Sequence, residues 1–521
     1  MRNTDTKSPG KTVIVGGRHL TLEEVCEVSR GSPLALEGGT AFRGRIERGA
    51  KVLADAIASG RIVYGVNTGY GDSCTVTIPS EVVEQLPAHL VRYHGCGLGD
   101  YFDEPAALAI LVTRLNSLAA GFSGVRMDVL QQIEGLVRHR IIPLIPEEGS
   151  VGASGDLTPL SYVAAAMMGD RQVLHQGRES TAAEALKAHG MQPLTLMPKE
   201  GLALMNGTSV MTALTCLAWE RAEYLSRLAT RITAMASIAL GSNPKHFAPG
   251  LFAVKPHAGQ QQVAARIFTD MGSSEHDSTI RIQDRYSIRC APHVIGVLAD
   301  ALGWMRRDIE NELNSANDNP IIDPDTGDIY HGGHFYGGHI AFVADSLKNA
   351  VANIADLLDR QLALLVDTRF NNGLPSNLSG AGEERASLNH GFKAVQIAVS
   401  AWTAEALKLT MPASVFSRST ECHNQDKVSM GTIAARDVIR VLELTEQVAA
   451  ACLAATAQAL EIRRRHGNRP PARMQTSIHA MRDDVLGLCP FVEEDRPLEH
   501  ELRRLCAAVS ERRWMLYGTQ Q

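Results

Sequence analysis

The part of the sequence that decides the fold reads Gly149-Ser150-Val151-Gly152-Ala153-Ser154-Gly155-Asp156-Leu157-Thr158-Pro159-Leu160. Its glycines leave little obstruction around one small hydroxyl residue, Ser154, and glycine is the residue that lets a chain bend tightly. Thr158 and Pro159 then predict a helix start, with the threonine as N-cap and the proline at the first helical position. We therefore expect a tight loop held against the N-terminus of a buried helix.

The composition favours a protein that binds neither nucleic acid nor membranes. The 521 residues carry 51 lysines and arginines against 57 acidic residues, so no strongly basic surface is expected. Residues 1–12 lack an apolar segment, and no later stretch offers the ~20 uninterrupted apolar residues that a membrane span needs. Nine cysteines without a C-x-x-C pair predict reduced thiols. We expect a soluble, cytoplasmic protein.

Three segments show the apolar spacing of long helices, namely 213–240, 341–367 and 434–462. Helices of this length with broad apolar faces pack in bundles and against other subunits. The expected fold is mainly α. An elongated bundle of long central helices with a helical C-terminal cap would occupy residues 212–521, and a smaller N-terminal lobe in residues 1–211 would carry the glycine loop.

Three further glycine-containing segments lie in the N-terminal lobe. Residues 64–71 read YGVNTGYG and residues 201–208 read GLALMNGT, and these admit structural interpretations as a loop and as an Asn-Gly turn. Residues 90–99 read LVRYHGCGLG. No strand precedes this segment and no downstream acid completes a dinucleotide-binding unit, so we do not assign it to a nucleotide.

Polar motifs separate the long helices. Residues 283–290 read QDRYSIRC and residues 314–320 read NSANDNP, which are typical of a solvated arginine and of capping turns. Three histidines, His331, His334 and His339, lie within nine residues and could bind zinc. Because no acidic ligand lies at a helical i, i+4 offset from them, we expect no metal site. A metal-dependent hydrolase and a non-catalytic helical scaffold are the alternatives from other classes.

These motifs occur in one order over about residues 40–462, and together they resemble the aromatic amino acid lyase family. That family contains the histidine, phenylalanine and tyrosine ammonia-lyases and the related 2,3-aminomutases. The segment GSVGASGDLTPL resembles the family's prosthetic-group loop almost letter for letter.

The resemblance implies a prosthetic group, 4-methylidene-imidazol-5-one (MIO), formed autocatalytically from Ala153, Ser154 and Gly155. The Gly155 nitrogen would attack the Ala153 carbonyl, and the loss of two waters would leave Ser154 as the methylidene carbon. This electrophile would capture the substrate amine and make it a better leaving group.

The resemblance also implies the other catalytic residues, which are Tyr64 as the base that removes the β-proton, Asn206 as a hydrogen-bond partner of the ring, and Tyr286. We expect positive charge from Arg289 and from helix N-termini to lower the pKa of Tyr64 toward the working pH.

Substrate-binding residues follow from the same resemblance. Tyr93 and His94 would contact the aromatic ring, and the planar fork of Arg289 would pair with the carboxylate. The remaining implied residues are Gln283, Asn317, Phe335, Glu421 and Gln425. The family's arrangement implies a homotetramer with active sites shared between chains.

We expect L-tyrosine as the substrate, deaminated to 4-coumarate and ammonia. His94 can hydrogen-bond a phenol, and residues 421–426, ECHNQD, differ from the NQED of histidine lyases. A histidine ammonia-lyase that forms urocanate is the alternative, because His94 could also meet an imidazole. An aromatic amino acid 2,3-aminomutase would have the same parts.

Overall fold

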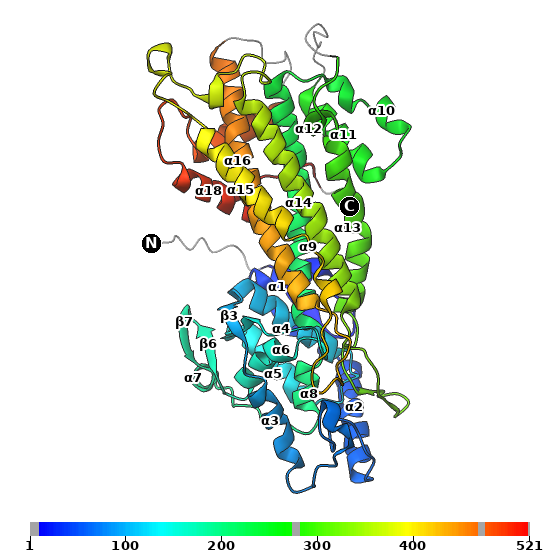
Figure 1. Ribbon diagram of the computed structural model, residues 1–521. Coiled ribbons are helices and arrows are strands. Elements are labelled where there is room, and N and C mark those ends of the chain that lie inside the picture. Colours follow the sequence, from blue (N-terminus) through cyan, green and yellow to red (C-terminus); the bar gives the residue numbers. More distant parts are fainter. Residues whose placement is uncertain (1–9, 273–281, 467–474, 519–521) are drawn as a thin grey trace. The chain divides into compact units, whose positions relative to one another are not determined.

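The computed structural model describes residues 10–272, 282–466 and 475–518, which are mainly helical, as expected (Figure 1). The longest helices are α9 (Ser209–Leu240), α13 (Ala291–Leu313), α14 (Gly338–Val366) and α16 (Gly431–Arg465). Helices α9, α14 and α16 coincide with the three segments that were predicted from apolar spacing.

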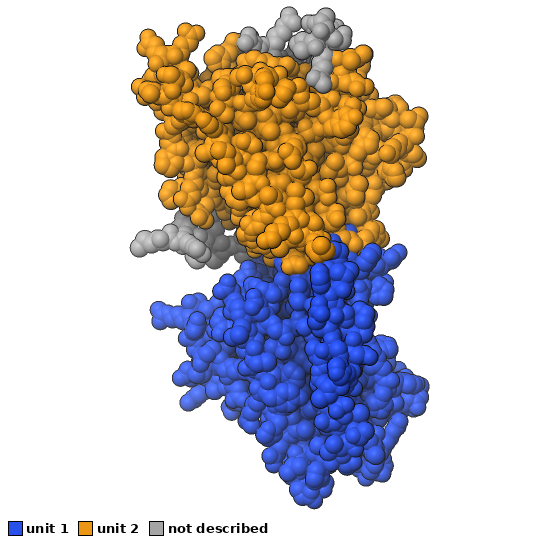
Figure 2. All heavy atoms as spheres, in the orientation of Figure 1, with its two compact units in different colours: residues 1–218, 305–345, 412–436 blue, residues 219–304, 346–411, 437–521 orange. Residues whose placement is uncertain are grey.

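The chain divides into two compact units (Figure 2). Unit 1 comprises residues 1–218, 305–345 and 412–436, and unit 2 comprises residues 219–304, 346–411 and 437–521. The sequence predicts one boundary after residue 211, whereas each unit takes three separate segments. Four of the five boundaries fall inside α9, α13, α14 and α16, where no glycine- or proline-rich linker marks them in the sequence, and the fifth, between Met411 and Pro412, lies between α15 and η6.

Unit 1 contains every strand of the described residues, in four small sheets. Strand β1 (Val13–Val15) pairs in parallel with β2 (Leu34–Leu36), while β3 (Leu98–Tyr101) with β5 (Pro146–Glu148), β8 (Ile321–Ile322) with β9 (Ile329–Tyr330), and the group β4 (Ile142–Pro143), β6 (Gln172–His175) and β7 (Arg178–Thr181) are antiparallel. Its complete helices are α1 (Leu22–Ser29), α2 (Thr40–Ala58), α3 (Leu86–Tyr93), α4 (Glu104–Ala119), α5 (Met127–Arg138), α6 (Leu157–Met167), α7 (Ala182–Ala188) and α8 (Glu200–Met205).

Helix α4 is the core element of unit 1. Every residue from Ala106 to Ala119 is buried, and α1 and α5 pack against it. The Asp103 side chain caps its N-terminus by accepting from the Ala106 backbone at 2.9 Å. Thr21 and Glu24 form the reciprocal capping box of α1 that their spacing predicts. Local signals therefore set the helix ends around this core.

Unit 2 contains the remaining helices and most of the length of the four long ones. Its complete helices are α10 (Pro249–Ala253), α11 (Ala258–Met271), α12 (Tyr286–Arg289), α15 (Lys393–Lys408), α17 (Thr476–Leu488) and α18 (Glu499–Ser510). Lys348 of α14 is fully buried and donates to the Met411 carbonyl at 2.7 Å and to Asp437 of α16 at 3.0 Å. Polar contacts of this kind fix the long helices of the unit in register.

Short 3₁₀ helices complete the described structure: η1 (Gly71–Thr75), η2 (Val83–Gln85), η3 (Pro244–Phe247), η4 (Ser376–Leu378), η5 (Glu383–Arg385) and η6 (Ala413–Phe416). Among the helices of the described ranges, none combines the length and the apolar character that crossing a bilayer requires.

Candidate active site

The glycine loop has a left-handed backbone at its centre. The φ angles of Gly152, Ser154 and Gly155 are +75°, +50° and +76°, and such values are uncommon for a residue with a side chain such as Ser154. A Cβ atom on Gly155 would lie 2.0 Å from the Gly207 carbonyl oxygen. The Gly207 N–H donates to the Ser154 carbonyl at 3.2 Å. Residues 153–155 therefore lie directly against the backbone of Gly207, in the tight loop that was predicted.

A second segment, residues 425–432, holds the loop from another side. A Cβ atom on Gly152 would lie 2.2 Å from the Ser429 hydroxyl, and the Met430 N–H donates to the Val151 carbonyl at 3.0 Å. The Gln425 amide lies 3.4 Å from the Ser154 hydroxyl, to which it donates. Gln425 is thus the predicted substrate-binding residue that directly contacts the glycine loop.

Asp156 connects the loop to helix α9. Its fully buried carboxylate accepts from the backbone N–H groups of Val210 and Met211, at 2.9 and 3.0 Å, and from the Thr432 hydroxyl. Burial raises the pKa of Asp156 to about 6, although these hydrogen bonds oppose the shift. The carboxylate therefore occupies the N-terminus of α9, where orphan N–H groups favour negative charge.

The prediction that Thr158 is the N-cap of the following helix is wrong. Helix α6 begins at Leu157 with Asp156 as its N-cap, so Thr158 and Pro159 lie inside its first turn. The Asp156 side chain makes no capping bond to its own helix, because it is committed to the first turn of α9.

Asn206 is buried beside the loop with its amide orientation fixed on one side. Its Nδ2 donates to the Asp318 carboxylate at 3.3 Å and to the Asn319 carbonyl at 3.0 Å. Its Oδ1 atom is buried and has no hydrogen-bond partner among the described residues. A buried acceptor without a partner costs free energy unless another group satisfies it.

Three buried charged residues that were not predicted from the sequence support this region. Lys199 and Asp318 form a fully buried ion pair at 2.6 Å. Arg114, in the middle of α4, donates to the Asn206 and Asn317 carbonyls at 3.3 Å, and burial lowers its pKa to about 10. An arginine within the apolar run 106–119 was the available signal, since such a residue is rarely buried without a partner.

Tyr64 lies in the loop before η1, where its hydroxyl accepts from the Gly71 N–H at 2.8 Å. Its backbone N–H donates to the His331 ring at 3.3 Å. Burial raises the pKa of Tyr64, and the carboxylate of Glu421 raises it further, against the lowering effect of the Gly71 N–H. The expected lowering of this pKa is therefore not found in unit 1, because a buried phenol beside a carboxylate resists ionisation.

The Glu421 carboxylate is held against the same loop. It accepts from the Asp72 backbone N–H, with the two oxygens at 2.9 and 3.0 Å from the nitrogen. Glu421, Cys422 and His423 follow one another with φ between +50° and +66°, so this turn is strained. The same carboxylate and Tyr64 add to burial in raising the pKa of Tyr93 to about 12. The structure thus brings Tyr64, Tyr93 and Glu421 into one electrostatic group.

His94 ends helix α3 beside Tyr93. The two ring centroids lie 4.4 Å apart, and Nδ1 of His94 lies 2.9 Å from the Leu90 carbonyl. A carbonyl can only accept, so Nδ1 carries the proton and Nε2 is the acceptor of the neutral ring. Burial lowers the pKa of His94, the hydrogen bond to the Leu90 carbonyl opposes this shift, and the charge of Arg171 adds to the lowering. The predicted ring-contacting pair therefore presents a neutral imidazole.

Other predicted residues of unit 1 have mainly structural contacts. Asn317 is buried, and its Nδ2 donates to the Glu312 carbonyl at 2.9 Å at the end of α13, as in a capping turn. Phe335 is half-buried in the loop before α14. Their roles toward a substrate stay predictions.

Gln283, Tyr286 and Arg289 belong to unit 2. Tyr286 and Arg289 are the first and last residues of α12, and Tyr286 is 72 % exposed. The Arg289 Nε donates to the Asp284 carbonyl at 3.0 Å, and its guanidinium lies 4.6 Å from the centroid of the Tyr286 ring. Arg289 is thereby oriented together with Tyr286.

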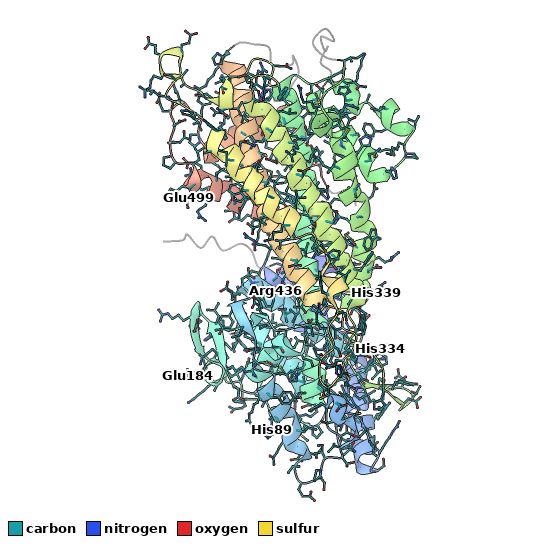
Figure 3. All side chains as sticks on the ribbon, in the orientation of Figure 1. His89, Glu184, His334, His339, Arg436 and Glu499 are labelled. Atoms are coloured by element: carbon teal, nitrogen blue, oxygen red, sulfur yellow. The ribbon has the colours of Figure 1, made fainter. Side chains whose placement is uncertain are left out.

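The histidines of residues 331–339 are spread over a loop and a helix. His334 lies in the loop before α14 and His339 lies in the first turn of that helix, and both are exposed (Figure 3). His331 accepts from the Tyr64 backbone, as described above. Across the described ranges, no three His, Cys, Asp or Glu side chains are grouped closely enough to hold a metal ion.

Residues 20–483 match the family model of aromatic amino acid lyases. A histidine ammonia-lyase from Geobacillus sp. (strain WCH70) is 36% identical over 487 residues, which cover 93% of this chain and 94% of that protein.

The chain is also similar to solved structures over nearly its whole length. A tyrosine aminomutase from Streptomyces globisporus has a TM-score of 0.89 at 32% identity, covering 96% of this chain and 97% of that chain. A histidine ammonia-lyase from Trypanosoma cruzi has a TM-score of 0.86 at 31% identity, covering 96% of this chain and 93% of that chain.

Proposed function

Because this chain belongs to the aromatic amino acid lyase family and is an ammonia-lyase, we propose that it deaminates L-histidine to urocanate and ammonia. The observation that carries the proposal is the 36% identity to a histidine ammonia-lyase over 93% of the chain. The Trypanosoma cruzi structure is a further relative with that activity in its name. The expectation of L-tyrosine as the first choice lacks this support and becomes the second candidate.

We propose that Ala153, Ser154 and Gly155 form the MIO ring, because three features of the structure fit it. The backbone of Ser154 is already left-handed. Gly155 lies so close to Gly207 that a side chain would not fit. The buried Asn206 Oδ1 has no partner in the described structure. When present, such a ring supplies an electrophile for the amino group of the substrate.

Tyr64 is the proposed base for the β-proton. Its hydroxyl accepts from the Gly71 N–H at 2.8 Å, and a donor at this position stabilises the phenolate that must form. Glu421 opposes ionisation of Tyr64, so the reaction needs compensating positive charge. The Arg289 guanidinium, held on α12, is the proposed partner of the substrate carboxylate, because its planar fork matches two carboxylate oxygens.

His94 supports a substrate ring that carries a hydrogen-bond donor. With Nδ1 committed to the Leu90 carbonyl, its Nε2 can accept from an imidazole N–H. A phenol O–H would satisfy the same acceptor. This contact therefore separates histidine and tyrosine from phenylalanine, and does not separate the first two from each other.

L-tyrosine is kept as the second candidate for a specific reason. Residues 421–426, ECHNQD, resemble the phenylalanine and tyrosine enzymes of the family more than the histidine lyases. The Streptomyces globisporus relative is a tyrosine aminomutase, so products are to be examined for β-amino acids as well as unsaturated acids.

We also propose a cytoplasmic homotetramer. Within unit 2, Val297 on α13 and Ile397 on α15 are 61% and 62% exposed, and large apolar side chains on long helices are typical of faces that other subunits cover.

The test is to incubate the purified protein separately with L-histidine, L-tyrosine and L-phenylalanine and to follow urocanate, 4-coumarate and cinnamate by ultraviolet absorbance. We expect the highest kcat/KM with histidine. Intact-protein mass spectrometry is expected to find the mass lower than the translated mass by two waters, and Ser154→Ala to restore the mass and abolish turnover. Turnover of tyrosine without histidine would select the second candidate, and an undiminished mass would remove the proposed electrophile.

A further inference from the structure

Arg171 lies between helix α6 and strand β6 and contacts the helix that carries His94. Its Nη2 donates to the Val91 carbonyl in α3 at 2.7 Å, and its Nη1 donates to the Ser161 hydroxyl in α6 at 3.0 Å. The guanidinium carbon lies 4.2 Å from the centroid of the Tyr162 ring. Its backbone has φ of +66°, which is uncommon for a residue with a side chain. The surrounding structure thus holds one arginine between two helices.

Arg171 also reaches the residues on both sides of the His94 peptide. The Ser161 hydroxyl, which accepts from Arg171, lies 3.2 Å from the His94 carbonyl and 2.7 Å from the Thr158 carbonyl. A Cβ atom on Gly95 would lie 2.2 Å from Nη2 of Arg171. The chain that leaves His94 therefore passes directly over the guanidinium, and a side chain at position 95 would displace it.

Two groups act on the His94 ring besides its burial and Tyr93, whose ring contacts it. The charge of Arg171 lowers the pKa of His94, and the hydrogen bond to the Leu90 carbonyl raises it. Arg171 is faced in turn by Tyr162, Asp170 and Cys96. A fixed cation beside an imidazole disfavours a second positive charge, so Arg171 opposes protonation of His94.

We propose that Arg171 is a positioning residue for the ring end of the substrate: it fixes the last turn of α3 and keeps His94 uncharged, so that Nε2 accepts a hydrogen bond from a ring N–H or O–H. The inference rests on the proposed function and narrows it to substrates whose ring carries a donor. A protonated His94 would present a donor instead, and two donors facing each other would repel such a ring.

The test compares Arg171→Met, which removes charge and hydrogen bonds, with Arg171→Lys, which keeps the charge and loses the fork. For the substrate with a ring donor, Arg171→Met is expected to lower kcat/KM about tenfold, mainly through KM, which is the effect of one hydrogen bond of ~1.4 kcal/mol. L-phenylalanine, whose ring carries no donor, is measured in parallel as a substrate or as a competitive inhibitor. Its kcat/KM or its affinity as an inhibitor is expected to fall less. Arg171→Lys is expected to recover part of the loss.

A double-mutant cycle separates this role from a general effect on folding. In the His94→Phe background, the ratio of kcat/KM for the substrate with a ring donor to that for L-phenylalanine is expected not to change on Arg171→Met. The reason is that the Nε2 acceptor of His94, which Arg171 is proposed to position, is then absent. Equal losses for both compounds, or an undiminished effect in the His94→Phe background, would overturn the inference. If Arg171→Met does not fold, the test uses Arg171→Lys. In that variant the ratio of kcat/KM for the substrate with a ring donor to that for L-phenylalanine is expected to fall about threefold. Absence of turnover in the unsubstituted protein with all three amino acids would instead refute the proposed function.

Discussion

At the scale of single residues, Tyr64 is the position where the proposal depends on one proton transfer. Tyr64→Phe is expected to lower kcat at least ~100-fold, the typical contribution of a positioned general base, and to leave the mass deficit of the ring intact. Tyr70→Phe is the matched control, since the Tyr70 hydroxyl is buried without a hydrogen-bond partner in the described structure. Stopped-flow or steady-state absorbance assays measure kcat for both variants. Full activity in Tyr64→Phe would show that Tyr64 is not the base.

The charge of Glu421 provides a second residue-level prediction. Burial and this carboxylate both raise the pKa of Tyr64, so the fraction of phenolate grows with pH and kcat/KM is expected to rise through the neutral range. Glu421→Gln removes the charge while an amide oxygen can still accept from the Asp72 N–H. The rising limb of the pH profile is therefore expected to move to lower pH. A limb that stays in place or moves to higher pH would contradict this coupling.

The candidate residues that sequence could predict are those whose signal is local. The glycine loop and the tyrosine loop are continuous motifs, and both lie where a site is built. Lys199 and Asp318, which form the buried ion pair below Asn206, are 119 residues apart, so no periodicity connects them. The direction of the pKa shift of Tyr64 could not be predicted from the sequence either, because it depends on burial and on Glu421, which is distant in the sequence.

At the scale of elements, the close approach of two backbones fixes the loop in unit 1. A Cβ atom on Gly207 would lie 2.1 Å from Nη1 of the fully buried Arg114 and 2.5 Å from the Asn317 carbonyl. Gly207→Ala is therefore expected to lower the free energy of unfolding by ~1–3 kcal/mol, the usual cost of overpacking.

Thermal unfolding followed by circular dichroism checks the Gly207→Ala prediction. The control is Gly303→Ala in helix α13, where nothing lies within 4 Å of the added carbon and alanine is expected to stabilise the helix. Equal unfolding temperatures for the two variants would show that the loop yields to the extra methyl group.

The carboxylate at the start of α9 predicts a dependence of stability on pH. The pKa of Asp156 is raised from 3.8 to about 6, so between these values the folded chain keeps a proton that the unfolded chain releases. The contribution of Asp156 to stability is therefore lost as pH rises from about 4 to 6, by up to ~3 kcal/mol, and is constant above. Asp156→Asn is expected to remove this part of the dependence.

Denaturant unfolding of both proteins between pH 4 and 7.5 measures the difference. A difference in stability between wild type and Asp156→Asn that does not change with pH would contradict the assignment.

Asp156 also shows why the N-cap of α6 was predicted wrongly. A capping sequence is read within one helix, whereas Asp156 serves the first turn of another that begins more than fifty residues later.

At the scale of the whole molecule, the expected assembly can be tested through the apolar residues of the long helices. Ile397, on α15, is 62% exposed in the single chain. If other subunits cover it, Ile397→Lys buries an unpaired charge and is expected to shift the protein from tetramer to smaller species in analytical ultracentrifugation. Ile397→Leu keeps the apolar surface and is the control. A monomer in the unsubstituted protein would refute the assembly itself.

The mainly helical fold followed from sequence because long apolar spacings are strong signals, as the agreement of α9, α14 and α16 with the predicted segments shows. The division into units did not follow. A boundary that falls within a continuous helix leaves the apolar spacing unbroken. The spacing in residues 209–240 therefore does not indicate that unit 1 ends at Ala218.

The interleaving of the two units limits how such a gene can be recombined. Each unit is encoded by three separated stretches, and four of the five junctions lie within the codons of a helix. A single crossover with a related gene between residues 219 and 436 would hence mix parental sequence within both units and leave neither unit wholly from one parent. Chimaeras that exchange one unit intact require all three of its stretches to be transplanted together.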